Sequence, residues 1–418
     1  MERGKTVLVA VNGRRNGEII ARLLAKQGHQ CITAAVILGP SRDEPEQIFT
    51  NLGRCFHSDE AALAASEERL RLPFYRINAF HEFVTEVFEP YLGARLAGRY
   101  FDPCLRCNAL KMRLLAKKAK ELNADAIAVG LNVRLVLDPR TGRKLLAQSD
   151  APDDQAYFLM QTDPDIYPFL LTPLGGMRRQ EINKLALEFG LDQNEQANLS
   201  TQKAAGTPAS TSPAAAAPSP ATLGLGPQCL DCIKAGQSSA FCFGQEQFLK
   251  ILEAKVSKKM FREGMVINMD NQHLLGEHLG IHRYFMGQRF VPDSLAGQGT
   301  VVTVAQIDYA SGQVRVSENP YPHAIDFVQI TRVVYLGIED LSVPRKVAIQ
   351  LGRSGIKIDA TLYFKNNDSA VAKFNFVHQA LIAPGVLVTI LADRRGHSVV
   401  LGHGIVEEFG KSYQLQRC

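Results

Sequence analysis

The first 130 residues of the chain alternate strand-like apolar runs with stretches whose apolar residues recur at helical spacing. Residues 7–11 predict a strand, and the loop 12–17 leads into a helix that Gly28 ends. The alternation continues with helices predicted over 59–70, 80–97 and 109–122 and strands over 74–77 and 126–129. Strands that alternate with helices indicate a parallel sheet with helices on both faces, and ligands of such sheets bind beyond the carboxyl ends of the strands.

The pattern changes after residue 200. Residues 201–228 are rich in Ala, Pro, Ser and Gly and carry only Lys203 as a charge, which predicts a flexible insertion. After a helix predicted over 244–256, short β-rich segments separated by Gly, Asn and Pro turns continue toward the C-terminus, at 300–307, 327–334, 346–349, 360–364 and 386–390. Short strands at this density indicate small barrels or sandwiches.

The composition fits a protein with ordinary packed cores. The 418 residues are 46% hydrophobic and 21% charged, which excludes a collagen, a coiled coil and a disordered protein, and the length predicts about two to four domains. No apolar run approaches the roughly 20 residues of a membrane helix, and residues 1–5 lead directly into the first predicted strand. We therefore expect a cytoplasmic protein with no membrane partner. The net charge of +5 permits a nucleic-acid partner without requiring one.

The chain has eight cysteines, and four of them form two CxxC motifs. Cys104 and Cys107 stand directly before a predicted basic helix, where the helix dipole and nearby cations favour a thiolate at Cys107. The spacing leaves a second interpretation open, because a buried CxxC or half of a structural zinc site has the same pattern.

The segment PCLRCN that contains this pair resembles the PCxxCN segment of the tRNA-specific 2-thiouridylases, the MnmA/TrmU-type sulfurtransferases, with Cys107 at the position of their nucleophilic cysteine. DQAYFL at 154–159 resembles the family's KDQSYFL, with Asp153 in place of the lysine. FCFG at 241–244 resembles GICFIGERNF and places Cys242 at the persulfide-bearing cysteine. Three further matches follow in the same order, YFMGQR at 284–289, APG at 383–385 and LGHG at 401–404.

The resemblance implies an N-terminal α/β domain of the PP-loop type (adenine nucleotide alpha-hydrolase), a small central domain and a C-terminal β-barrel, with tRNA lying across all three. On this basis we expect the α/β domain over 1–200, the insertion over 201–228, the cysteine loop and central domain over 229–325, and the barrel over 326–418.

The implied chemistry is ATP-dependent 2-thiolation of the wobble uridine. ATP, with Mg²⁺, adenylates the oxygen at C2, and sulfur from a cysteine persulfide displaces AMP. Cys242 would carry the persulfide, supplied by a sulfur donor or relay protein, and Cys107 would be its partner thiol, since the sulfur–sulfur bond must be resolved by a second thiolate. About 135 residues separate the two cysteines, so a loop must close to bring them together.

The resemblance also assigns the binding positions. Those implied for ATP are Asn12, Gly13, Arg14, Asn16, Gly17, Val36 and Gly130. Those implied for tRNA are Asp102, Pro103, Cys104, Asp153, Asp154, Gln155 and Gln379.

The phosphate loop departs from the family pattern. Where the family has SGGxDSS, this chain has NGRRNGE at 12–18 and keeps only Gly13 of the conserved types. Arg14 adds a side chain where backbone N–H groups approach phosphate, and Asn16 removes the carboxylate near magnesium. In a second family motif, GHY, the histidine is replaced by Leu131. Arg14 and Arg15 retain a charge that attracts phosphate, or they form an ordinary solvated loop.

The second CxxC pair, Cys229 and Cys232, has no counterpart in the family pattern. Candidate ligands of a [4Fe–4S] cluster are Cys104, Cys107 and Cys242, as in some family members. Two CxxC pairs would equally form a four-cysteine zinc site, or the second pair would be a redox couple. We expect Cys31 and Cys55, which lack partner spacing, to pack as small apolar residues.

The leading interpretation is therefore a tRNA-uridine 2-sulfurtransferase with an altered ATP site. The alternative is a paralogue that binds tRNA without ATP-driven thiolation. A third class, a carrier of sulfur or of an iron–sulfur cluster, needs no nucleic acid. ATP turnover, tRNA affinity with its salt dependence and metal content distinguish the three.

Overall fold

The computed structural model describes residues 4–40, 60–139, 141–148, 154–191, 245–353, 356–394 and 396–412. Its N-terminal part contains a five-stranded sheet in the order β3-β2-β1-β4-β7, and all four pairings in it are parallel. The strands are β1 (Thr6–Ala10), β2 (Gln30–Ile37), β3 (Phe74–Asn78), β4 (Ala126–Ala128) and β7 (Leu170–Leu171). The predicted parallel sheet is confirmed.

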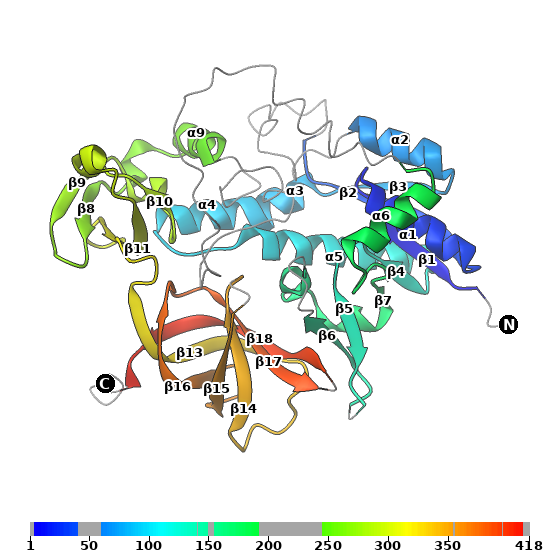
Figure 1. Cartoon of the computed structure of the whole chain (residues 1–418). Coiled ribbons are helices and arrows are strands. Elements are labelled where there is room, and N and C mark those ends of the chain that lie inside the picture. The colour runs from blue at the N-terminus through cyan, green and yellow to red at the C-terminus, as the bar shows by residue number, and fades with distance from the viewer. Residues whose placement is uncertain are drawn as a thin grey trace.

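Helices cover both faces of this sheet (Figure 1). The helices are α1 (Arg15–Lys26), α2 (Glu60–Leu70), α5 (Pro103–Glu121) and α6 (Arg179–Glu188). Side chains of β1 point alternately to the two sides: Leu8 packs with α5, whereas Val7 and Val9 pack with α1 and α6. Gly28 follows α1 with a φ of 84°, as the sequence predicted for the end of that helix.

Two predicted helices have different bounds in the structure. The helix expected over 80–97 consists of α3 (Phe80–Phe83), a π-helical turn (Val84–Phe88) and α4 (Glu89–Leu96). Pro90 has no N–H for the helical ladder, and the widened turn lies directly before it. Helix α5 begins six residues before the predicted position, because Asp102 caps it and Pro103 occupies its first turn. Both cysteines of PCLRCN therefore lie inside the helix.

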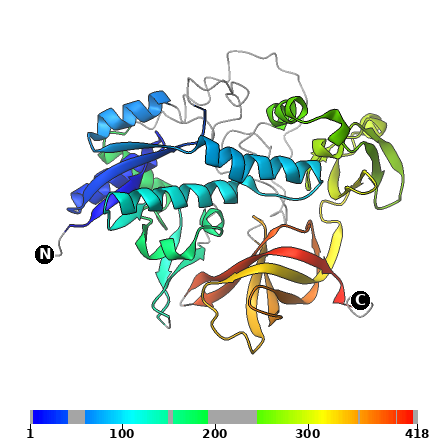
Figure 2. The ribbon, with the colours of Figure 1, turned by 180° about the vertical axis from the view of Figure 1, so that it is seen from behind.

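A small central sheet has the order β10-β11-β12-β8-β9. It follows helix α9 (Gln245–Lys255) and is built from β8 (Gly264–Asn268), β9 (Leu274–His278), β10 (Arg289–Phe290), β11 (Val302–Asp308) and β12 (Gln313–Ser317). Seen from behind in Figure 2, α4 and α5 extend from the parallel sheet toward this central part.

The C-terminal part is a closed six-stranded antiparallel barrel, as predicted. Its order is β13-β16-β15-β14-β17-β18, and pairing between β13 and β18 closes it. The strands are β13 (His323–Tyr335), β14 (Arg345–Leu351), β15 (Lys357–Phe364), β16 (Ala370–Ala380), β17 (Leu387–Arg394) and β18 (His397–Gly410).

A hairpin of the N-terminal part extends the barrel sheet. Strands β5 (Arg134–Leu137) and β6 (Lys144–Gln148) were not predicted; β6 pairs with β18 through Ser398 and Val399. Gln148 donates a buried 2.6 Å hydrogen bond to Gln350 of β14, and Arg394 of β17 forms a 2.7 Å ion pair with Asp138. The barrel and the parallel sheet are thus joined by backbone and side-chain bonds.

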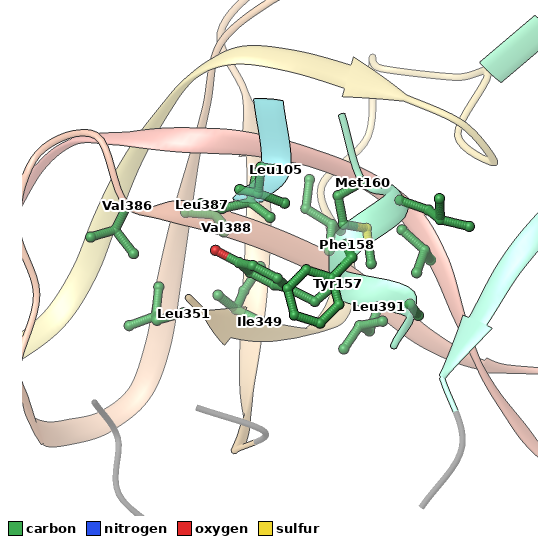
Figure 3. Close-up of a cluster of buried hydrophobic side chains, with 14 of the residues drawn as sticks. Leu105, Tyr157, Phe158, Met160, Ile349, Leu351, Val386, Leu387, Val388 and Leu391 are labelled. Carbon is green, nitrogen blue, oxygen red and sulfur yellow. The ribbon is translucent and has the colours of Figure 1, made fainter. Parts of the chain in front are cut away.

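Apolar packing joins the same two parts at the start of α5. Figure 3 shows Leu105 of α5 and the rings of Tyr157 and Phe158 among barrel residues that include Ile349 and Leu387. The two rings belong to a 3₁₀ turn (Ala156–Leu159) within the segment DQAYFL. No helix in the described parts of the chain is long and apolar enough to cross a membrane.

Candidate functional site: the cysteine helix and the loop after strand β1

The first two turns of α5 carry the two thiols. Asp102 caps the helix by accepting a 3.0 Å hydrogen bond from the Cys104 backbone N–H. Cys104 is buried, Cys107 is half-buried, and neither forms a disulfide. Asn108 donates to the Cys104 carbonyl at 2.8 Å. The more accessible thiol therefore lies near the positive end of a 19-residue helix dipole.

The Asp102 carboxylate is buried and receives three side-chain donors. Arg353, which follows β14 in the barrel, donates from Nη2 to Oδ1 at 2.7 Å and from Nε to Oδ2 at 3.0 Å. Tyr157 donates its hydroxyl at 2.9 Å. The side chains of Asp102 and Arg353 are only 2% and 8% exposed, so the implied tRNA contact at Asp102 is closed to solvent in this structure.

Aromatic rings cover this ion pair. The Arg353 guanidinium lies 5.3 Å from the Tyr157 ring centroid and 4.9 Å from that of Phe158. Burial opposes the charge on Arg353, but the Asp102 carboxylate beside it raises the guanidinium pKa above its ordinary value. Burial, reinforced by Asp102, also raises the pKa of Tyr157, so the phenol keeps the proton that it donates.

Within DQAYFL, polar groups connect to the loop after β4. Gln155 accepts a 2.8 Å hydrogen bond from the Asn132 backbone N–H through its side chain and donates its own backbone N–H to the Asn132 carbonyl at 2.9 Å. Asp154 accepts from the Ala156 N–H at 3.0 Å. These bonds fix the segment containing Gly130 beside the phosphate loop. Asp153 lies outside the described residues.

The loop after β1 is folded tightly against its neighbours. Asn12 accepts a 3.2 Å hydrogen bond from the Arg14 backbone N–H, and Gly13 has a φ of 75°. Asn16 donates its side-chain amide to the Gly130 carbonyl at 3.3 Å. Gly17 lies so close to β1 that an added Cβ would lie 3.0 Å from the Ala10 carbonyl oxygen.

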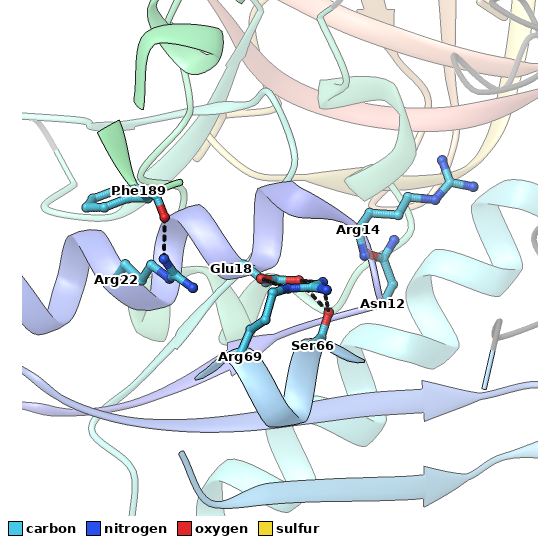
Figure 4. Close-up of polar contacts among 7 residues, drawn as sticks. All are labelled: Asn12, Arg14, Glu18, Arg22, Ser66, Arg69 and Phe189. Atoms are coloured by element: carbon cyan, nitrogen blue, oxygen red, sulfur yellow. Dashed lines mark hydrogen bonds and ion pairs between the residues drawn. The ribbon is translucent and has the colours of Figure 1, made fainter. Parts of the chain in front are cut away.

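Two arginines and a buried glutamate fix the start of α1. Arg15 donates to Asn183 of α6 at 2.7 Å. Glu18 is fully buried and binds Ser66 and Arg69 of α2, whereas the labelled Arg14 side chain points away from that cluster (Figure 4). Arg22 in the next turn donates to the Phe189 carbonyl.

The remaining predicted positions lie in other elements of the fold. Val36, half-buried in β2, pairs with Ile77 of β3. Gln379 is exposed on β16 opposite Ala324. Cys31 is 4% exposed and packs in the core, as expected for a small apolar residue, and burial raises its pKa. Cys55, Cys229, Cys232 and Cys242 lie outside the described residues.

Comparisons with known proteins agree with this architecture. Residues 5–202 match the family model described as tRNA methyl transferase HUP domain. A tRNA-specific 2-thiouridylase of Rickettsia typhi is 26% identical over 96% of this chain and 98% of its own length, and one of Methylorubrum extorquens is 26% identical over 97% and 94%. One of Geotalea uraniireducens is 28% identical over 68% of this chain, a match that spans 66% of that relative, just under two thirds.

Over nearly its whole length, the chain is similar to proteins named tRNA-specific 2-thiouridylase. These relatives confirm the resemblance inferred from PCLRCN, DQAYFL and the motifs that follow.

The resemblance to the 2-thiouridylases implies magnesium, which the side chains of the phosphate loop do not fit. Asn16 stands where the family has a carboxylate, and its amide is bonded to Gly130. Glu18 is fully buried and paired with Arg69. No group of three His, Cys, Asp or Glu side chains that would hold a metal ion exists within the described ranges.

The backbone of the same loop fits a phosphate group better. Arg14, at the N-cap position of α1, supplies no side-chain cap, and Gly13 takes the left-handed conformation that the turn requires. The positions that the resemblance implies for ATP are this loop, Gly130 and Val36 of β2. For a [4Fe–4S] cluster, the described residues supply two of the three candidate ligands, Cys104 and Cys107, one helical turn apart.

One functional candidate was missed in the sequence. Arg353 is a single arginine after a barrel strand and belongs to no motif, so no local pattern connects it with Asp102, which is 251 residues away.

Proposed function

We propose that the protein is a tRNA-uridine 2-sulfurtransferase in which Cys107 and Cys242 are the reacting thiols. The observation that carries this proposal is the half-buried Cys107 thiol near the capped N-terminus of α5. A helix N-terminus stabilises the thiolate needed to attack a sulfur–sulfur bond. The proposed substrate is the wobble uridine of tRNA, since the relatives carry the name tRNA-specific 2-thiouridylase.

In the proposed reaction, Cys242 carries a persulfide received from a sulfur donor or relay protein. Its terminal sulfur attacks C2 of the uridine in place of the activated O2, and the Cys107 thiolate then attacks the Cys242 sulfur. The bond between the Cys242 sulfur and the uridine sulfur breaks, 2-thiouridine is released, and the Cys107–Cys242 disulfide that remains is reduced by an external thiol. When bound, ATP would supply the activation of O2 as an adenylate leaving group. Asp102 holds the cysteine turn by capping α5, and Gln155 holds the neighbouring loop.

The proposed tRNA contacts are the exposed or half-exposed parts of the implied set. Asp154, Gln155 and Gln379 are candidates from the described residues, and Asp153 is a candidate from outside them. Pro103 and Cys104 are buried at the start of α5, so we propose that they support the site from the protein interior. The domain bounds 1–200, 201–228, 229–325 and 326–418 belong to the same proposal.

A second candidate function is a paralogue that binds tRNA without ATP-driven thiolation. It is favoured by one specific observation, the replacement of the loop carboxylate by Asn16 together with the burial of Glu18 against Arg69. Magnesium then has no carboxylate ligand in the described loop.

One experiment separates the two functions. Protein purified without oxygen is given ATP, Mg²⁺, unmodified tRNA and a persulfide donor, and AMP release, 2-thiouridine and bound iron are measured. AMP and 2-thiouridine that appear together, with 2-thiouridine lost in Cys107→Ser, support the sulfurtransferase. Binding of tRNA with neither product supports the second candidate, and no tRNA binding contradicts both.

A further inference from the structure

One arginine of the barrel reaches the cap of the cysteine helix. Arg353 reaches from the end of β14 to Asp102, the residue that caps α5, and binds both of its carboxylate oxygens. The same carboxylate accepts the Cys104 backbone N–H at 3.0 Å. The cap of the thiol-bearing turn is thus completed by a side chain from the C-terminal barrel.

The side chain of Arg353 is held in one conformation by its surroundings. Its side chain is 8% exposed and lies against the rings of Tyr157 and Phe158. The groups that act electrostatically on its charge are Asp102, Cys104, Tyr157 and Tyr100. A bidentate guanidinium–carboxylate pair has a fixed geometry, so the position of Arg353 also fixes that of Asp102.

We propose that Arg353 is a positioning residue that makes the reactivity of the α5 thiols depend on the docked barrel. It acts through Asp102, holding the cap in place and balancing its negative charge beside the first turn. The relevance for sulfur transfer rests on the proposed function, but the effect on the Cys107 thiol does not.

Opposite substitutions test this role. In Arg353→Met the Asp102 carboxylate loses its cation, and its charge then disfavours a nearby thiolate; Cys107 should be alkylated by iodoacetamide at least about threefold more slowly at pH 7. In Asp102→Asn the amide still caps α5 while the Arg353 charge is left unbalanced, so alkylation should be at least about threefold faster. Mass spectrometry of the peptide that contains Cys107 gives the rate for this cysteine alone.

Two further variants separate positioning from general loosening. Arg353→Lys keeps the charge but loses the bidentate fork, so its rate should lie between that of the natural protein and that of Arg353→Met. Arg394→Met removes another ion pair between the barrel and the N-terminal part, the pair of Arg394 with Asp138. Because Asp138 does not cap the cysteine helix, the rate of Cys107 alkylation should stay within about twofold of the natural rate.

The proposal is overturned if Arg353→Met and Asp102→Asn shift the rate in the same direction, which is the result of a loosened structure, or if neither shifts it beyond twofold. Alkylation needs no tRNA, ATP or sulfur donor. Opposite shifts in a protein that forms no 2-thiouridine would therefore support the positioning role and contradict only the proposed sulfurtransferase.

Discussion

Arg69 of α2 binds Glu18 in the first turn of α1, with Nε 2.9 Å from Oε2 and a second bond from Nη2 to Oε1. Glu18 is fully buried, whereas the Arg69 side chain is 40% exposed. The residue that replaces a hydroxyl in the family's phosphate loop thus ties that loop to α2.

Removing the arginine should leave a buried carboxylate without its cation. We expect Arg69→Met to lower the free energy of unfolding by about 2 to 4 kcal/mol, because a buried charge that loses its partner is costly. The matched control is Arg76→Met, which breaks the exposed pair with Glu67 and should cost below about 1 kcal/mol. Urea unfolding followed by circular dichroism measures both; equal losses would contradict the assigned role of Glu18.

Gly13 should tolerate no side chain. An added Cβ would lie 2.9 Å from the Ala62 Cβ and 3.0 Å from its carbonyl carbon, in addition to the strain at a φ of 75°. We expect Gly13→Ala to cost about 2 to 4 kcal/mol. Gly142 has a similar φ of 68° but nothing within 4 Å of an added Cβ, so Gly142→Ala should cost only about 1 kcal/mol. The difference between their urea midpoints gives the cost of the contact with α2.

Cys107→Ser should abolish sulfur transfer, by at least about 100-fold, because a serine hydroxyl cannot resolve a sulfur–sulfur bond. Affinity for tRNA should stay within about twofold, since phosphate contacts from other residues dominate it. The control is Cys31→Ala, a buried thiol whose pKa is raised by burial and which should transfer sulfur normally. Thionucleoside analysis and filter binding measure the two effects, and thiolation that survives in Cys107→Ser would reject this nucleophile.

Acid should destabilise the barrel through His403. Burial in β18 lowers the pKa of His403 to about 4, so the folded protein keeps it neutral while the unfolded chain binds a proton below about pH 6.5. Stability from this group is therefore complete above pH 6.5 and falls by up to about 3 kcal/mol as the pH decreases to 4. Burial lowers the pKa of His278, His282 and His323 in the same direction.

The contribution of His403 is isolated by His403→Gln. Urea unfolding at pH 7, 6 and 5 should show a shallower loss of stability in this variant than in the natural protein. Parallel pH profiles would show that His403 is not the group responsible.

Much of the parallel sheet could be predicted because its signals are local. The apolar run that contains Val7 and Val9 and the turn at Gly28 each have a periodicity or a residue type with a physical cause. The start of α5 was missed although Asp102 and Pro103 are strong cap signals. Strands β5 and β6, of four and five residues, carry little pattern of their own, since β6 is completed only by β18.

In the candidate site, too, some residues could be found from local sequence and others are brought together only by the fold. Cys104 and Cys107 were found because their spacing is local, and the structure places them one helical turn apart in α5. Arg353 could not be found, because its partner Asp102 is brought to it only by the packing of the barrel. The pairing of Asn16 with Gly130 depends likewise on two neighbouring parallel strands rather than on sequence proximity.

Because β6 pairs with β18, its partner strand is synthesised long after β6 itself. Gln148 leaves the ribosome about 250 residues before Ser398, its partner across the sheet. At a translation rate of roughly 5 to 20 residues per second, one edge of the β5–β6 hairpin stays unpaired for about 12 to 50 seconds. During that interval the nascent chain exposes the unpaired backbone N–H and C=O groups of β6. We therefore expect chaperones, or the same edge of a neighbouring nascent chain, to bind at this hairpin.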